Sequence, residues 1–181
     1  MRITAIDPGN EETAIVQISD DYRPTVFAKV DNYEALFMLE RLQDEAELLG
    51  ARHYFVIEQV AHYGTGMPAG KTIFDTCVWI GRYKQTIADL LHVSGAEAEA
   101  AAVNLVPRKE YVLQFCRTTR AGDPNVIQYL ADRFAPGETN HGKGTKKAPG
   151  WFYGFKADVW QAYALAVYEL DRRKNGKEVK D

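Results

Sequence analysis

Apolar and polar residues alternate in three short stretches near the start of the chain. This two-residue period is typical of β-strands that bury one face and expose the other. Gly9-Asn10 and Asp20-Asp21 are turn formers between the stretches, so we expect an antiparallel meander. The three predicted strands cover residues 1–7, 12–19 and 24–30.

The period changes to that of a helix at residue 32. Leucine and alanine recur three or four positions apart over residues 32–49, with Asp31 or Asn32 as the N-cap and Gly50 as the stop. The apolar run at 53–58 then predicts a fourth strand. A helix between two strands indicates a crossover connection and a parallel pairing of those strands.

The rest of the chain predicts more helices and one more short strand. A Gly-rich loop over 61–70 comes first, and the Ala- and Glu-rich residues 96–102 extend the next helix or start another. Ile73 and Cys77 fall on the apolar face expected for that next helix, and Asp123 stands where an N-cap would. The strand is expected over residues 103–106 and the helices over 72–91, 108–116, 124–134 and 155–173.

Residues 135–154 differ from their surroundings in composition. They include five glycines, two prolines and the basic residues Lys143, Lys146 and Lys147. We expect a mobile basic loop within one domain that covers residues 1–174, followed by a charged tail over 175–181.

Composition narrows the class of protein. The 181 residues suit one domain, and no run of about 18 apolar residues predicts a membrane span. No signal peptide is expected, and Cys77 and Cys116 fit no metal-binding spacing, so we expect buried, reduced thiols and a cytoplasmic protein. The net charge of −3 argues mildly against a nucleic-acid binder without excluding one.

Three acidic residues lie at places where a buried charge needs compensation. Asp7 and Glu58 each end an apolar strand, and Asp158 falls in the first turn of the last predicted helix. Carboxylates of this kind can hold two divalent cations about 4 Å apart for phosphoryl displacement. The alternative is structural, with Asp7 and Asp158 as turn and cap residues and Glu58 as a surface acid.

The order of elements resembles the RNase H fold, and the local motifs resemble the RuvC family of Holliday-junction resolvases, particularly its phage-type members. The resemblance covers nearly the whole chain. The residues that carry it are Ile6-Asp7-Pro8-Gly9, Ile57-Glu58-Gln59, Pro107-Arg108, and the run Asp158-Val159-Trp160-Gln161-Ala162 in the last helix.

The resemblance implies an α/β, RNase H-like fold. Its five-stranded mixed sheet would combine three antiparallel strands with parallel ones and be flanked by helices. It also implies a metal-dependent endonuclease, using Mg²⁺ or Mn²⁺ with two ions per site. Such enzymes act as homodimers on four-way or branched DNA, resolving it by paired symmetric nicks, in a bacterium or a phage-infected cell.

By the same resemblance, Asp7, Glu58 and Asp158 are the catalytic metal ligands. The bacterial family has a second acid three residues after the first on the last helix. Here that position is Gln161, a weaker candidate ligand that adds no charge. The basic candidates for DNA contacts are Arg82, Arg108, Lys109, Lys143, Lys146 and Lys147.

Three other functions remain open at this stage. Residues 66–72 resemble the phosphate loop of a P-loop NTPase, but Thr65 stands where the motif needs glycine. Gln161 leaves open a protein that binds junctions without cutting them. The third possibility is another nuclease on this fold, acting on flaps, forks or RNA–DNA hybrids.

Overall fold

The computed structural model describes residues 1–60, 70–95 and 103–178 of the chain. The Gly-rich stretch at 61–69 and the Ala- and Glu-rich stretch at 96–102 lie outside these ranges, as does most of the phosphate-loop-like segment. The strands are β1 (Arg2–Pro8), β2 (Glu12–Ser19), β3 (Pro24–Asp31), β4 (His53–Gln59) and β5 (Val103–Pro107). The helices are α1 (Asn32–Leu48), α2 (Lys71–Leu90), α4 (Arg108–Cys116), α5 (Asp123–Phe134), the 3₁₀ turn η1 (Asn140–Gly142) and α6 (Val159–Glu178).

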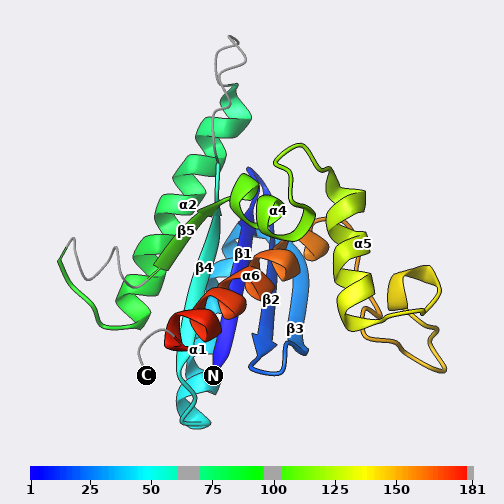
Figure 1. Cartoon of the computed structure of the whole chain (residues 1–181). Helices are drawn as coiled ribbons and strands as arrows, with labels where there is room; N and C mark the ends of the chain where they lie inside the picture. Colours follow the sequence, from blue (N-terminus) through cyan, green and yellow to red (C-terminus); the bar gives the residue numbers. More distant parts are fainter. Residues whose placement is uncertain (61–69, 96–102, 179–181) are drawn as a thin grey trace.

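The five strands form one mixed sheet in the order β3-β2-β1-β4-β5 (Figure 1). Neighbouring strands are antiparallel from β1 to β3 and parallel from β1 through β4 to β5. This arrangement confirms the predicted meander and crossover. It brings the carboxyl ends of β1, β4 and β5 to the same edge of the sheet.

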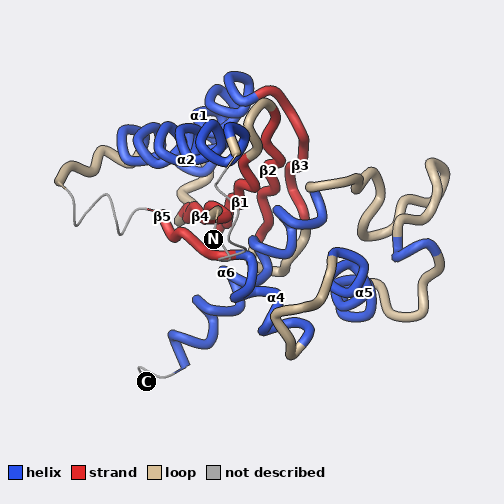
Figure 2. The backbone as a smooth tube through the Cα atoms, turned by 90° about the horizontal axis from the view of Figure 1, so that it is seen from above, coloured by secondary structure: helices blue, strands red, loops and turns tan. Residues whose placement is uncertain are grey.

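Helices cover both faces of the sheet (Figure 2). On one face, Ile6 and Ile57 pack with Leu39 of α1 and Ile80 of α2. On the other face, α6 lies across β1 and β2, and α4 and α5 pack beside it. The sheet is therefore the middle of three layers, with an apolar core on each side.

Strand alternation decides which layer each strand-end acid faces. Successive side chains point to opposite faces, so Asp7 shares the α6 face with Ala5, and Glu58 shares it with Val56. The parallel register pairs Ile6 with Ile57, which makes the two acids neighbours just beyond that pair. Both carboxylates therefore lie between the sheet and α6.

The last helix differs from its predicted bounds at both ends. It begins at Val159 rather than at residue 155, because Gly154 and Ala157 take positive φ values of 86° and 40° that a helix cannot accommodate. Asp158 is thus a turn residue whose backbone carbonyl accepts the first helical hydrogen bonds, from the amides of Gln161 and Ala162. The helix continues to Glu178, into the stretch predicted as a tail.

The buried face of α2 also differs from the prediction. The helix buries Thr76, Ile80 and Tyr83, whereas Ile73 and Cys77 are exposed. The first turns of α2 project beyond the ends of the strands, so no sheet covers them (Figure 1). The prediction of two buried thiols was therefore wrong for Cys77, although both cysteines are free.

Residues 135–154 form a succession of turns rather than an open loop. Gly144 and Pro149 form an isolated bridge, and Gly142 is buried at a φ of 70° against Ala135. Phe152 is fully buried against α6. The mobility of this segment stays a prediction.

No helix within the described ranges is long and apolar enough to cross a membrane.

Candidate active site

Carboxylates gather at the edge of the sheet where β1 and β4 end. Asp7 and Glu58 are neighbours there, and Asp158 approaches from the turn that starts α6. The negative charges of Glu58 and Asp158 both lie close enough to Asp7 to raise its pKa. The structure thus brings the three predicted acids to one region, although they are separated by up to 151 positions in sequence (158 − 7).

Burial and mutual repulsion make this acidic group electrostatically unfavourable by itself. Burial raises the pKa of Asp7 well above its usual range, and the charges of Glu58 and Asp158 raise it further. Burial also raises the pKa of Glu58, while a hydrogen bond from Tyr111 and the charge of Arg108 oppose that rise. A bound cation would offset the repulsion among these carboxylates.

Lys29 on β3 supplies one positive charge to the group. Its Nζ lies 2.8 Å from Oδ2 of Asp158 and 3.3 Å from Oε2 of Glu12. Asp7 pairs with Ala14, and Ala14 pairs with Lys29, so the three residues form one row across β1, β2 and β3. The methyl side chain of Ala14 leaves room for the lysine to reach the acidic end of the sheet.

Arg108, the first residue of α4, supplies the second positive charge. Its Nη1 donates to the Tyr111 hydroxyl at 2.9 Å and to Oε1 of Gln161 at 2.8 Å, and its Nη2 pairs with Asp123. Asp123 therefore binds Arg108 and does not cap α5; Gly122 precedes that helix instead. The guanidinium joins α4, α5 and α6 beside the carboxylates.

Two of the three acids have a protein partner: Glu58 accepts from the Tyr111 hydroxyl, and Asp158 pairs with Lys29. Among the described residues, no three His, Cys, Asp or Glu side chains are arranged to hold one metal ion. Asp158 pairs with Lys29, and 49% of its side-chain surface remains exposed. The oxygen-only donor set still has the chemistry that Mg²⁺ and Mn²⁺ prefer, and Asp158 is free to exchange one cation for another.

The predicted basic residues separate into two groups. Arg108 and Lys109 line a hollow of about 320 Å³, together with Val112, Thr119 and Ala121. Among the described residues, no acidic side chain lines this hollow, and through Arg108 it adjoins the carboxylates.

The other basic residues have different surroundings. Lys143 lies over the Trp160 ring at 5.8 Å, and Lys146 and Lys147 are exposed. Within the described part of the chain, none of these lysines forms an ion pair with the three carboxylates. Arg82 packs on Trp79 at 4.4 Å, on the opposite side of the sheet.

Two residues of the site were missed in the sequence. Lys29 carries a weak signal, since it is the single charged residue inside an alternating strand, but its partner depends on the pairing of β2 with β3. Tyr111 looks like an ordinary core aromatic of α4. Its role depends on where Glu58 lies after folding, which no local pattern encodes.

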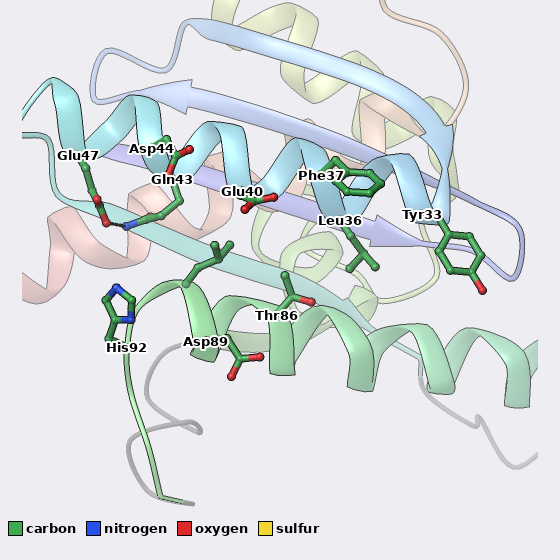
Figure 3. A pocket seen from close by; sticks show the side chains of 11 residues that line it. Tyr33, Leu36, Phe37, Glu40, Gln43, Asp44, Glu47, Thr86, Asp89 and His92 are labelled. Atoms are coloured by element: carbon green, nitrogen blue, oxygen red, sulfur yellow. Dashed lines mark hydrogen bonds between the residues drawn. The ribbon is translucent and has the colours of Figure 1, made fainter.

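A second hollow lies between α1 and α2, with a volume of about 460 Å³ (Figure 3). Of the residues that the structure describes, Leu36 and Leu90 line it together with four acids and no lysine or arginine. It belongs to the helical layer opposite α6, and its negative charge would repel phosphates. The groove is therefore a poor surface for nucleic acid. Its acidic residues are Glu40, Asp44, Glu47 and Asp89.

The fold matches solved structures of a protein from Thermus thermophilus. A structure of T. thermophilus RuvC matches with a TM-score of 0.60 and 14% sequence identity, covering 97% of each chain. T. thermophilus RuvC in complex with a Holliday junction substrate matches with a TM-score of 0.61 and 12% identity, covering 97% of this chain and 96% of that one. These matches confirm the predicted RuvC-like, RNase H-like fold. No protein-family profile and no curated protein matches the sequence.

Proposed function

We propose that this chain is a metal-dependent endonuclease that resolves four-way DNA junctions by paired, symmetric nicks. One observation carries the proposal: on a RuvC-like fold, three carboxylates from β1, β4 and the start of α6 meet at one edge of the sheet. The similarity to a RuvC structure bound to a Holliday junction supports the choice of substrate.

Asp7, Glu58 and Asp158 would hold the metal, Mg²⁺ or Mn²⁺, with two ions per site. When bound, such ions activate water and stabilise the charge that develops on a phosphodiester during in-line displacement. Asp158 would leave Lys29 to take part, and Lys29 would then be free to pair with a DNA phosphate. Each of these side chains belongs to a different element, so the folded sheet sets their spacing.

Arg108 and Lys109 would hold the DNA backbone near the scissile phosphate. The hollow that they line holds these two basic side chains and, among the described residues, no acidic one, although Arg108 also pairs with Asp123 at its edge. Lys143, Lys146 and Lys147 would extend this positive surface along the turns that precede α6. Arg82 packs on Trp79 on the other side of the sheet, so it is not part of the proposed DNA surface.

A second copy of the chain would supply the second nick. The exposed side of α2 offers an apolar surface for this contact, since Phe74 and Val78 are each 62% exposed. A homodimer places one site on each of two strands, as paired cleavage requires.

The test is cleavage of a labelled four-way junction by the wild type and by Asp7→Asn, in Mg²⁺ and in EDTA. We expect paired nicks from the wild type in Mg²⁺ alone. Asp7→Asn should lower the rate by more than about a hundredfold, because losing a residue that only supports a ligand already costs about 10–100-fold. Junction binding should persist, and Asp44→Asn, at an exposed position of α1 on the opposite side of the sheet from α6, should cut normally.

Each of the other outcomes selects a different function. Retained cleavage by Asp7→Asn would refute the metal site. Metal-dependent cutting of forks, flaps, hybrids and plain duplex alike would keep the chemistry and reject the junction as the specific substrate. Tight junction binding by a wild type that never cuts would favour a protein that binds junctions without cleaving them. The neutral Gln161, which adds no charge to the site, would be consistent with that function.

A further inference from the structure

Tyr111 joins the core of the protein to the acidic site. Its ring is 0% exposed and packs beside Phe115, with ring centroids 6.3 Å apart. Its hydroxyl donates a hydrogen bond to Oε2 of Glu58 at 2.7 Å. The packed ring fixes the position of the hydroxyl, and the hydroxyl in turn fixes one oxygen of the Glu58 carboxylate.

The direction of this hydrogen bond is set by a neighbouring group. Arg108 has only donors, and its Nη1 lies 2.9 Å from the Tyr111 oxygen, so that oxygen must accept there. The single hydroxyl proton then points to Glu58.

Gln161 fixes Arg108 from the other side. Its Oε1 accepts from the same Nη1 at 2.8 Å, and its side chain is buried at the start of α6. A chain of three hydrogen bonds therefore runs from α6 through α4 to β4. Its members, in order, are Gln161, Arg108, Tyr111 and Glu58.

We propose that Tyr111 is a positioning residue that orients Glu58 for metal binding, and that Gln161 acts through Arg108 and Tyr111 rather than as a metal ligand. The inference rests on the proposed function. With Oε2 engaged by Tyr111, the other oxygen of Glu58 is left for the cation. Hydrogen bonds of this kind hold a ligand in its binding orientation before the metal arrives.

The inference also gives a reason for the neutral side chain at position 161. A carboxylate there would add a fourth negative charge beside Asp7 and Glu58 and would form an ion pair with Arg108. An amide oxygen holds the same guanidinium without adding repulsion. Arg108 thereby keeps positive charge available to the phosphate as well as to the acids.

Tyr111→Phe tests the proposal because it removes the hydroxyl and keeps the ring. The readout is the affinity of the DNA-free protein for Mn²⁺, titrated with the metal alone. We expect binding about 10–100-fold weaker than in the wild type. Junction binding in EDTA should be unchanged. The matched control is Tyr83→Phe, which removes the hydroxyl of an equally buried tyrosine that bonds Thr13 on the other face of the sheet.

Gln161→Met completes a double-mutant cycle with Tyr111→Phe. If Gln161 acts through Tyr111, the double variant binds Mn²⁺ no more weakly than Tyr111→Phe alone. Additive losses would identify Gln161 as a ligand in its own right and overturn that half of the proposal.

The remaining outcomes separate this inference from the proposed function. Unchanged Mn²⁺ affinity in Tyr111→Phe, beside a wild type that binds Mn²⁺ and cuts junctions, would refute the role of Tyr111 alone. A wild type that neither binds Mn²⁺ nor cuts would refute the proposed function beneath it. If Tyr111→Phe lowers only the thermal midpoint, the hydroxyl serves stability and not the metal site.

Discussion

At the scale of single residues, two of the three site acids already have a protein partner. Asp158 pairs with the ammonium group of Lys29, and Glu58 accepts from the hydroxyl of Tyr111. The two partners differ in what a metal must do to them. A cation that binds Asp158 competes with Lys29 for the same carboxylate, whereas Tyr111 can keep its hydrogen bond while Glu58 binds through its other oxygen.

Lys29→Met is expected to tighten Mn²⁺ binding by the DNA-free protein. The variant removes the competing charge but keeps an unbranched side chain of similar length. The ion pair is partly exposed, so we expect a gain of only about twofold to fivefold. Metal titration of the purified variant measures it. Lys71→Met, which breaks the ion pair with Asp75 on α2, should leave Mn²⁺ affinity unchanged. Weaker binding by Lys29→Met would show that Lys29 does not compete.

Sequence reasoning found the three acids because each stands at the end of a recognisable element. It also identified Arg108 by its place after β5, but not the partners that orient the guanidinium. Lys29 and Tyr111 escaped because their roles depend on contacts across the sheet and between layers. The loop lysines were nominated by closeness in sequence to Asp158, a criterion that says little about distance once the intervening turns are formed.

At the scale of elements, a buried polar chain ties α1 to the sheet. Nδ1 of His53 on β4 donates to Oε1 of Gln43 on α1 at 2.9 Å, which leaves Nε2 to accept from Thr4 of β1 at 2.8 Å. Gln17 of β2 donates to the same threonine oxygen. This pattern needs a neutral imidazole, and burial, with the charge of Arg2, lowers the pKa of His53 to about 4.

Stability should therefore fall in mild acid because of His53. Its pKa is about 4 in the folded protein and near 6.5 in the unfolded chain, so between these values only the unfolded chain takes up the proton. The contribution of neutral His53 to the free energy of unfolding is present above pH 6.5 and is lost as the pH falls toward 4. Between pH 7.5 and pH 5 the loss is about 2 kcal/mol.

Urea unfolding at the two pH values measures this effect as the difference between the wild type and His53→Gln, which cannot titrate. The exposed His92 provides the control as His92→Asn, because asparagine tolerates its positive φ of 53°. That variant should keep the pH dependence of the wild type. Equal pH dependence in the wild type and His53→Gln would contradict a neutral His53.

The elements themselves were predictable wherever one face of a strand or helix is buried along its whole length. The first three strands and α1 follow from period and β4 from its apolar run, and Asp31 caps α1 as expected, accepting from the amide of Tyr33. The errors fall where an element projects past its neighbours or begins in an unusual turn. The first turns of α2 have no sheet beneath them, and Ala157 delays the start of α6 by adopting a left-handed conformation.

At the scale of the whole molecule, the order of strands and helices predicted the mixed sheet and its flanking helices through its resemblance to the RNase H fold. The sequence did not indicate where the proposed dimer contact would lie, because apolar positions on α2 can serve the core or a partner equally well. In the structure, Tyr83 and Ile87 are buried, while Phe74 and Val78 are exposed.

The double variant Phe74→Glu, Val78→Glu is expected to be a monomer. A dimer would carry four added charges facing one another across an apolar contact. Removing these charges from water would cost more free energy than burying the apolar contact contributes. Sedimentation equilibrium should show half the mass of the wild type, and junction cleavage should stop at single nicks. Leu48→Glu, at an 88% exposed position near the end of α1, should behave as the wild type. A double variant that remains dimeric would place the contact elsewhere.

The position of α6 late in the sequence determines when the three acids can come together during protein synthesis. Asp7 and Glu58 can meet once β4 has paired with β1, but Asp158 arrives only with the helix that packs across β1 and β2. A chain whose translation stops before residue 158 therefore holds two of the three acids and lacks α6, the helix that packs across β1 and β2. Under the proposed function, the three acids can therefore come together only after the ribosome has released residue 158 and the helix that follows it.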